Sequence, residues 1–226
     1  MFTKYANAIA IAARQGGGNP EANFKLRLAI ESARSINMPK DNIQRAIDRG
    51  SGSSGASGVL EEVIYEGFAP FGVALVIEAV TDNRQRTSGQ IRALLDKHGG
   101  SLAGPGATSF QFKKQGEIGI NLEDKNAEEA SLEVIDYGAE DVEVIGNQLF
   151  VYTPTDQLES VKNKLTEHSY VVASADLTMT PITMITITDK DQAQKILSLI
   201  EKIDELDDVL KVYANVDIPE EVVEAV

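Results

Sequence analysis

The stretch Val-Glu-Val-Ile-Gly-Asn-Gln-Leu-Phe-Val-Tyr, residues 142–152, holds two apolar-rich runs on either side of a Gly-Asn pair. Such a pair between two strand-forming runs is typical of a two-residue β-hairpin. On each side of this hairpin the chain continues with one helix and then one strand. The expected elements are strand 117–121, helix 127–137, strand 142–145, strand 148–152, helix 155–168 and strand 171–178. That order, βαββαβ, predicts a ferredoxin-like unit.

A second set of strands and helices flanks this unit in the sequence. Before it we expect strands at 60–65, 72–81 and 110–113 and a helix over 84–97; after it we expect strand 183–188, helix 191–203 and strand 209–214. The tail is too small to close a core alone. Together with the strand-helix-strand of residues 72–113, it completes a second βαββαβ unit. We therefore predict a discontinuous α/β domain, 59–115 plus 181–226, and an inserted ferredoxin-like domain, 116–180.

The first fifty residues have a helical pattern. One helix is expected from Phe2 to Gln15, a second after an Asn19 cap with Pro20 at its first position, and a third after Pro39. Residues 51–58 contain only Ser, Gly and one Ala, a composition typical of a flexible linker. The predicted fold class is α+β: a three-helix N-terminal domain, 1–50, the linker, and two ferredoxin-like α/β domains, one inserted into the other.

Charge is distributed unevenly along the chain. Up to Gly50 there are eight Lys and Arg against four Asp and Glu, a net charge of +4, whereas the remaining residues hold 13 basic and 31 acidic side chains, a net charge of −18. A basic segment on an acidic chain points to contact with a polyanion such as a nucleic acid. The alternative is a solvated helical face that is basic without a partner.

Several classes of function have no support in the residues. The chain has no Cys, and its two His residues, His98 and His168, have no acidic or thiol neighbours at ligand spacing, so we expect no metal site and no cofactor. No arrangement of Ser, His and Asp suggests a catalytic centre, so we expect no enzyme. The apolar run 6–13 is too short to span a membrane. We expect a cytoplasmic protein without a small-molecule substrate or membrane partner.

Arg84 and Arg86 lie in the first turn of a predicted helix, where the helix dipole disfavours cations. One hypothesis is a clamp in which both guanidinium groups hold an anion at the helix start. The alternative is that they pair with nearby acids, such as Glu66 and Glu78. His98, just before Gly99, is expected to be a helix C-terminal residue that bonds a carbonyl.

Five short motifs occur in order in the first hundred residues. They are Ala-Arg-Gln-Gly-Gly-Gly-Asn-Pro-Glu-Ala-Asn at 13–23, Asn-Met-Pro-Lys-Asp-Asn-Ile at 37–43 with Arg-Ala-Ile at 45–47, Tyr-Glu-Gly at 65–67, Thr-Asp-Asn-Arg at 81–84 with Arg-Thr at 86–87, and Lys-His-Gly-Gly at 97–100. With them the chain resembles the YebC family, the YebC/PmpR transcriptional regulatory proteins, related to the mitochondrial translational activator of cytochrome c oxidase.

The resemblance implies a helical N-terminal domain, two α/β domains and a non-enzyme that acts on gene expression. Members are described as DNA-binding transcriptional regulators or as translation factors acting on ribosomes or messenger RNA. The family's nucleic-acid contacts would map onto the basic residues of the helical domain: Arg14, Lys25, Arg27, Arg34, Lys40, Arg45 and Arg49. Family members usually carry a basic, Trp-containing leader before the position of Phe2. This sequence lacks it, and we expect weaker binding to polyanions as a result.

These observations lead to a ranked set of hypotheses. The first is a nucleic-acid-binding regulator of gene expression, a DNA-binding transcriptional regulator that contacts the phosphate backbone through the basic helices. The second is a translation factor that binds RNA within the ribosome, with ribosomal proteins as further partners. The third is an adaptor whose basic face binds an acidic protein or the acidic domains of its own chain.

Overall fold

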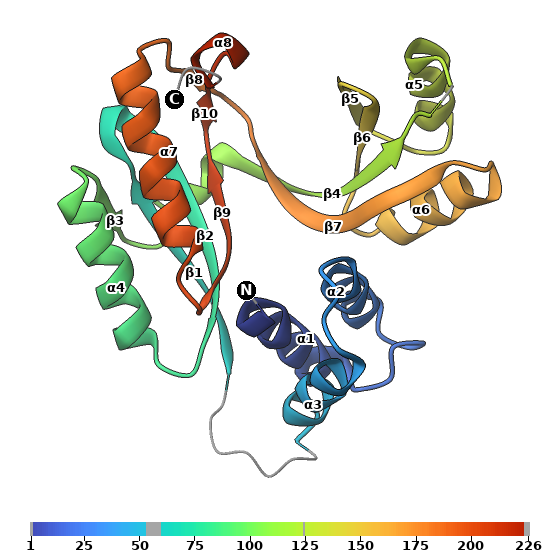
Figure 1. Ribbon diagram of the computed structural model, residues 1–226, viewed down its shortest axis with the longest axis horizontal. Coiled ribbons are helices and arrows are strands. Elements are labelled where there is room, and N and C mark those ends of the chain that lie inside the picture. The colour runs from blue at the N-terminus through green and yellow to red at the C-terminus, as the bar shows by residue number, and fades with distance from the viewer. Residues whose placement is uncertain (1, 53–59, 124, 224–226) are drawn as a thin grey trace. The chain divides into compact units, whose positions relative to one another are not determined.

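The computed structural model describes residues 2–52, 60–123 and 125–223. The chain is an α+β protein with three N-terminal helices followed by two four-stranded antiparallel sheets, each with its own helices (Figure 1). It divides into two compact units, Met1–Phe112 with Pro181–Val226 and Lys113–Thr180. The four-part domain division made from the sequence stays a prediction. Most of the linker expected over 51–58 lies outside the described residues, from residue 53 onward.

The N-terminal helices are α1 (Phe2–Gly16), α2 (Phe24–Ser35) and α3 (Lys40–Gly50). Their apolar faces form one small core, as their periodicity requires. Its buried members are Ile9, Ala12, Ala13, Leu26, Ile30, Ala33, Met38, Ile43, Ala46 and Ile47.

The connection between α1 and α2 is held by Asn23. Its amide oxygen accepts the Leu26 N–H at 3.1 Å and caps α2, while its amide nitrogen donates to the carbonyls of Ala12 and Gly17, each at 2.8 Å. The expectation that Asn19 caps this helix is therefore wrong. Asn19 instead accepts the Glu21 N–H in a separate turn, and the helix begins after Asn23, whose side chain bonds both the loop and the first turn.

The first sheet has the strand order β3-β1-β2-β9. Its strands are β1 (Glu61–Phe68), β2 (Ala74–Thr81), β3 (Ser101–Ala103) and β9 (Val209–Ala214). Helices α4 (Arg84–Lys97) and α7 (Lys190–Asp204) contribute to the same core. Strand β2 lies at the centre and is buried on both faces, which explains its continuous apolar sequence.

Two expected strands of this sheet are wrong. Residues 109–111 form a short 3-10 helix, η2 (Ser109–Gln111), and β4 (Phe112–Asn121) belongs to the second sheet. The place beside β2 that was expected for residues 110–113 is taken by β1. Only the short turn η1 (Pro70–Gly72) joins β1 to β2, and the two strands pair as a hairpin from Glu61↔Thr81 to Phe68↔Ala74. The strand expected at 183–188 shrinks to β8 (Ile185–Thr186), which pairs in parallel with β10 (Val216–Asp217). A last short helix is α8 (Glu220–Val223).

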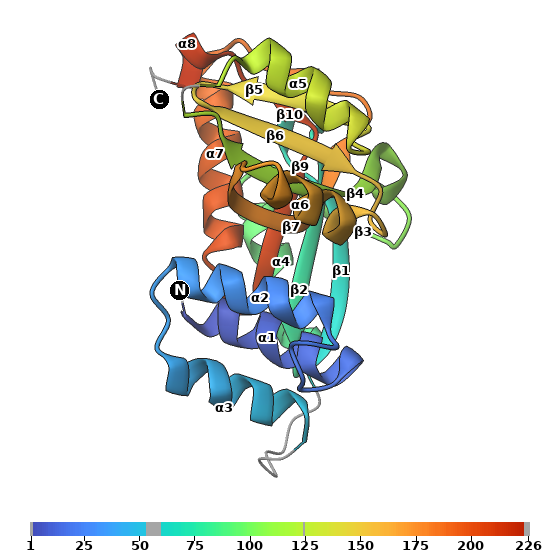
Figure 2. The same cartoon turned by 90° about the vertical axis from the view of Figure 1, so that its right-hand side faces the viewer.

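The second sheet follows the expected βαββαβ order. After β4 come α5 (Ala127–Asp136), β5 (Asp141–Ile145), β6 (Gln148–Thr153), α6 (Leu158–Glu167) and β7 (Val171–Pro181). The strand order is β5-β6-β4-β7, and Gly146, with φ of 59°, begins the two-residue turn between β5 and β6. Figure 2 shows α5 and α6 in front of this sheet.

The two faces of the second sheet differ in their residues. Ile118, Ile120, Leu149 and Val151 are fully buried on the face that α5 and α6 cover. Because side chains alternate along a strand, the residues between them project from the opposite face, which no helix of the same unit covers within the part of the chain described.

Candidate nucleic-acid interface

Two of the seven cations expected to contact nucleic acid are unengaged. Arg34 lies at the end of α2 and Lys40 at the start of α3, and both are exposed. Among the described residues, neither side chain has a hydrogen-bond or ion-pair partner. Their charge is therefore available to an external anion without the loss of an existing contact.

Arg45 and Lys25 are exposed and lightly engaged. Arg45 bonds the Asn42 side chain one turn away and the Asp41 carbonyl at 3.3 Å, while the Lys25 ammonium donates to the Gln15 side chain at 3.3 Å. These are contacts to neutral groups on the surface, and each contributes little stability. A phosphate oxygen would offer a stronger, charge-assisted bond.

Arg14 and Arg27 have closer partners. Arg14 donates to the Leu60 carbonyl just before β1. Arg27 donates to the carbonyls of Pro20 and Glu21 at 2.8 and 2.9 Å, and its guanidinium lies 5.6 Å from the Phe24 ring centre. Both residues therefore help to position loops of this unit.

Arg49 is half-buried and is bonded to α1. It donates to the Asn7 side chain at 2.7 Å and to the Ala6 carbonyl at 3.2 Å, and its Nε is buried without a partner among the described residues. Burial lowers the pKa of Arg49, although the Asp82 charge opposes this shift. Asn7 was missed as its partner, although a polar residue within an apolar run is a signal for a buried hydrogen bond.

Arg84 and Arg86 pair with acidic side chains, which was the alternative to the anion clamp. The acids are not Glu66 and Glu78, which were expected from the sequence. Arg84 lies 2.5 Å from Glu61, and Arg86 lies 3.0 Å from Asp82 and 2.6 Å from Asp208. An anion would have to displace these carboxylates. The anion clamp itself stays a prediction.

Asp208 has a network of donors. Burial alone would raise its pKa, but hydrogen bonds from Arg86, Thr87 and Thr81 hold that pKa below its ordinary value. The Thr87 hydroxyl lies 2.7 Å and the Thr81 hydroxyl 3.1 Å from its Oδ2. The Asp208 carboxylate thus neutralises the charge of Arg86 within the protein.

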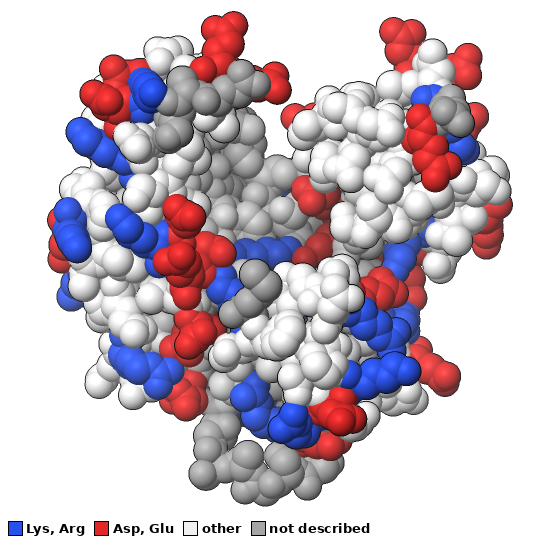
Figure 3. Space-filling model, in the orientation of Figure 1, with Lys and Arg blue, Asp and Glu red and all other residues white. Residues whose placement is uncertain are grey.

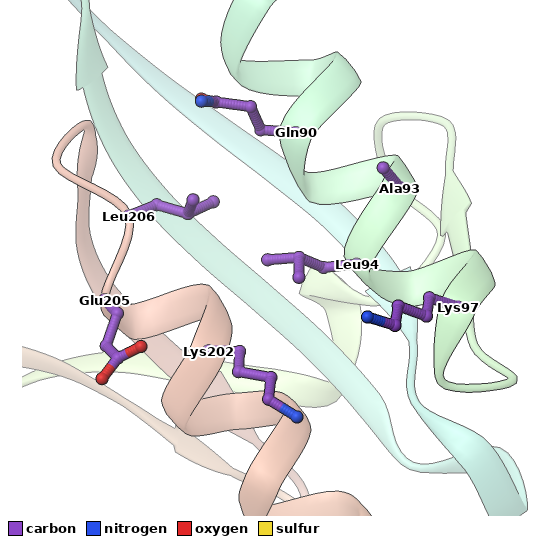
Figure 4. Close-up of a pocket in the computed structure, with 7 residues that line it drawn as sticks. All are labelled: Gln90, Ala93, Leu94, Lys97, Lys202, Glu205 and Leu206. Atoms are coloured by element: carbon purple, nitrogen blue, oxygen red, sulfur yellow. The ribbon is translucent and has the colours of Figure 1, made fainter.

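An open pocket of about 550 Å³ lies between α4 and α7 (Figure 4). Its lining residues are Gln90, Ala93, Leu94, Lys97, Lys202, Glu205 and Leu206. Next to it, His98 ends α4: its Nδ1 lies 2.8 Å from the Leu94 carbonyl, so Nδ1 carries the proton and Nε2 accepts from Lys202 at 3.1 Å. His98 therefore satisfies a helix carbonyl, as its position predicts.

The described ranges contain neither a metal-binding cluster nor a membrane-spanning helix. No group of three or more His, Asp or Glu side chains there has the geometry to hold a metal ion. Within the same ranges, no helix combines the length and the apolar character needed to cross a membrane.

The surface reflects the uneven charge of the sequence. Figure 3 shows Lys and Arg atoms over α2 and α3, while Asp and Glu atoms are frequent on the remaining parts. One cation of the helical part, Lys4, is used internally in an ion pair with Asp204 at 2.9 Å. Fold and charge together define a class: α+β proteins in which a basic three-helix part precedes two acidic parts, each built on a four-stranded sheet.

Comparison with known families identifies that class. A model of the TACO1/YebC protein N-terminal domain matches residues 1–53, and a model of the TACO1/YebC second and third domain matches residues 60–216. This chain belongs to the TACO1/YebC family.

Known relatives are similar over almost the whole chain. Proteins named "Probable transcriptional regulatory protein" from Roseiflexus castenholzii and Halothermothrix orenii are 49% and 43% identical, over 99% and 100% of this chain and 89% and 90% of their own lengths. The crystal structure of a conserved hypothetical protein from Aquifex aeolicus is similar with a TM-score of 0.88 and 42% identity, covering 97% of this chain and 90% of that one.

Proposed function

We propose that this protein is a nucleic-acid-binding regulator of gene expression, a transcriptional regulator of the YebC type that acts in the cytoplasm. Its basic helices would contact the phosphate backbone. The observation that carries this proposal is the group of exposed, weakly engaged or unengaged cations on α2 and α3: Lys25, Arg34, Lys40 and Arg45. Curated relatives that are named as transcriptional regulators support it.

The energetics favour these four residues over the other candidates. Phosphate binding to Arg34 or Lys40 breaks no existing contact, whereas Arg49 would have to leave Asn7 and a buried position. Removing a buried partner leaves a polar group unsatisfied, which costs about 1–3 kcal/mol. We therefore leave Arg49, Arg84 and Arg86 out of the proposed contact surface and treat Arg14 and Arg27 as its margin.

The experiment is a salt titration of binding to duplex DNA, structured RNA and ribosomes. Each duplex phosphate contact contributes about 0.9 to the slope of log K against log salt, and each single-strand contact about 0.7. The triple variant Arg34→Ala, Lys40→Ala, Arg45→Ala should therefore reduce the slope by about 2–3 and weaken binding most at low salt. Fluorescence anisotropy with labelled probes measures both quantities.

The matched control removes three cations elsewhere. Arg92, Lys190 and Lys195 are exposed on α4 and α7, and among the described residues none has a hydrogen-bond or ion-pair partner. Changing all three to Ala alters the net charge by the same amount but should leave the slope nearly unchanged. Equal effects of the two triple variants would show that total charge, and not the surface of α2 and α3, governs binding.

A second candidate, a translation factor that binds RNA within the ribosome, is favoured by the surface of α3. Asp41 and Asp48 lie on this short helix among its cations, and Gln44, a residue type that reads bases, donates to Asp48 at 2.8 Å. Acids on a helix oppose its insertion between two phosphate backbones. If RNA or ribosomes bind at least tenfold more tightly than duplex DNA, a difference of about 1.4 kcal/mol, this second function replaces the first.

We also propose that both sheets are ferredoxin-like, with the second unit inserted into the first. In the second sheet the order β5-β6-β4-β7 corresponds to a βαββαβ chain. In the first sheet, β2, β3, β1 and β9 would take the places of the first, second, third and fourth strands of such a unit, and the spatial order β3-β1-β2-β9 then matches that of the second sheet. The two sheets would therefore share one arrangement in space, although β1 comes first along the chain and not third.

A further inference from the structure

The open face of the second sheet carries two aromatic side chains among carboxylates. Across neighbouring strands, Tyr152 lies between Glu117 and Asp141, and Phe150 lies between Gly119 and Glu143. These rows alternate with the buried residues that face α5 and α6, so they project from the side opposite those helices.

Tyr152 is the centre of this arrangement. Its hydroxyl donates to the Glu143 carboxylate at 3.2 Å, on the diagonal between the two rows. Burial and the nearby charges of Glu117, Glu143 and Asp141 raise its pKa above the ordinary value. The phenol therefore stays neutral near pH 7, and three carboxylates lie close enough to its ring to act on it.

Phe150 is half-buried, and its ring lies beside Gly119 on the neighbouring strand. A Cβ on Gly119 would lie 2.6 Å from the Ser174 hydroxyl and 3.6 Å from the Phe150 ring. Even alanine would therefore crowd this position. At the end of β5, Ile145 is 56% exposed and extends the same face toward the edge of the sheet.

The charge of this unit decides what the face attracts. Residues 113–180 hold five Lys and Arg against 14 Asp and Glu, a net charge of −9, and residues 127–145 hold seven acids and no Lys or Arg. Paired aromatics on a central strand of such a sheet can stack on RNA bases, but carboxylates on both sides repel the phosphates that RNA would bring. A cation is attracted by the rings and by the carboxylates together.

We propose that this face, made of Glu117, Asp141, Glu143, Ile145, Phe150 and Tyr152, binds an extended, arginine-bearing segment of another protein. Arginine suits it better than lysine, because a planar guanidinium stacks on an aromatic ring and forks onto a carboxylate. The two rows are two residues apart along each strand, about 7 Å. An extended segment with arginines at alternate positions presents its side chains at the same spacing.

The test uses the full chain and a fluorescent twelve-residue peptide in which arginine alternates with alanine. Asp141→Asn with Glu143→Gln, and separately Tyr152→Leu, should each weaken peptide binding at least about tenfold. The control pair Glu129→Gln with Glu167→Gln removes two charges from the helix-covered side and should change the affinity less than twofold. A peptide with citrulline in place of arginine should not bind.

Amide NMR of the unmodified chain makes the test independent of the variants. The arginine peptide should shift the signals of residues 117–121, 141–145 and 148–152. The proposal is overturned if both double variants weaken binding equally, since net charge alone then explains it. It is also overturned if a single-stranded oligouridine, and not the peptide, shifts these signals, or if the face proves to be covered by a second copy in sedimentation experiments.

Discussion

Glu66 shows how one buried acid can organise a loop. Its carboxylate is only 6% exposed and accepts the N–H groups of Gly106, Thr108 and Ser109 at 2.7, 2.6 and 2.8 Å. Burial would raise its pKa, but these bonds outweigh it and lower the pKa from 4.5 to about 2. The loop after β3 therefore depends on a negative charge supplied by β1.

Glu66 leads to a prediction about pH. Because its folded pKa lies below its unfolded value, its contribution to stability is full above about pH 4.5 and is lost as the pH falls toward about 2. Glu66→Gln should destabilise the protein by about 1–3 kcal/mol at pH 7, since an amide cannot accept all three bonds. Urea unfolding at pH 7 and pH 3 measures the difference, which should shrink at the lower pH. Glu167→Gln is the control, and an equal difference for Glu66→Gln at both pH values would contradict the assigned role.

At the scale of elements, two helical glycines differ in the space available for a side chain. A Cβ at Gly50, the last residue of α3, would lie 2.1 Å from the Ala10 carbonyl oxygen of α1, whereas a Cβ at Gly89 in α4 would meet nothing within 4 Å. A glycine at a helix end often adopts a left-handed conformation, but Gly50 does not have a positive φ. It is instead required because α1 and α3 approach each other closely.

The paired substitutions test this contrast. Gly50→Ala should destabilise the protein by about 1–3 kcal/mol through the clash with α1. Gly89→Ala should stabilise it by about 0.5–1 kcal/mol, because alanine loses less backbone entropy in a helix. Thermal and urea unfolding report both changes. If the two variants shift stability in the same direction, α1 and α3 are not in the close contact described.

At the scale of the whole molecule, the chain returns to its first sheet after completing the second. Strand β9 pairs with β2, from Leu75↔Ala214 to Ala79↔Val209, and α7 contributes Ile196 and Leu199 to the first core. The first unit thus depends on residues that follow residue 180 in the sequence.

Truncation should separate the two units. A chain that ends at residue 180 lacks β9 and α7, so we expect it to be poorly soluble and to keep the unfolding transition of the second unit without a cooperative transition of the first. Residues 113–180 alone contain both helices and all four strands of the second sheet and should unfold cooperatively. Circular dichroism during urea unfolding tests both fragments. A further cooperative transition in the 1–180 fragment, beyond the one that residues 113–180 show alone, would indicate that β9 does not complete the first core.

Several features were accessible from the sequence because their causes are local. The Gly146-Asn147 turn, the helix over residues 84–97, the alternation of β6 and the basic N-terminal segment each follow from residues that are near one another in the chain. The family motifs are also local strings of residues.

Other features were decided only by tertiary structure, because they join residues far apart in the sequence. No local pattern shows that β1 and not residues 110–113 completes the first sheet, since this depends on which strand pairs with β2. The same is true of Arg86, which meets Asp208 across 122 positions, and of Arg49, which meets Asn7 across 42. By itself, the sequence determined most of the helices and strands, the segregation of charge and the family. The strand pairing, the cations left free for an anion and the aromatic face among carboxylates came from long-range packing, in which register and burial outweigh local preference.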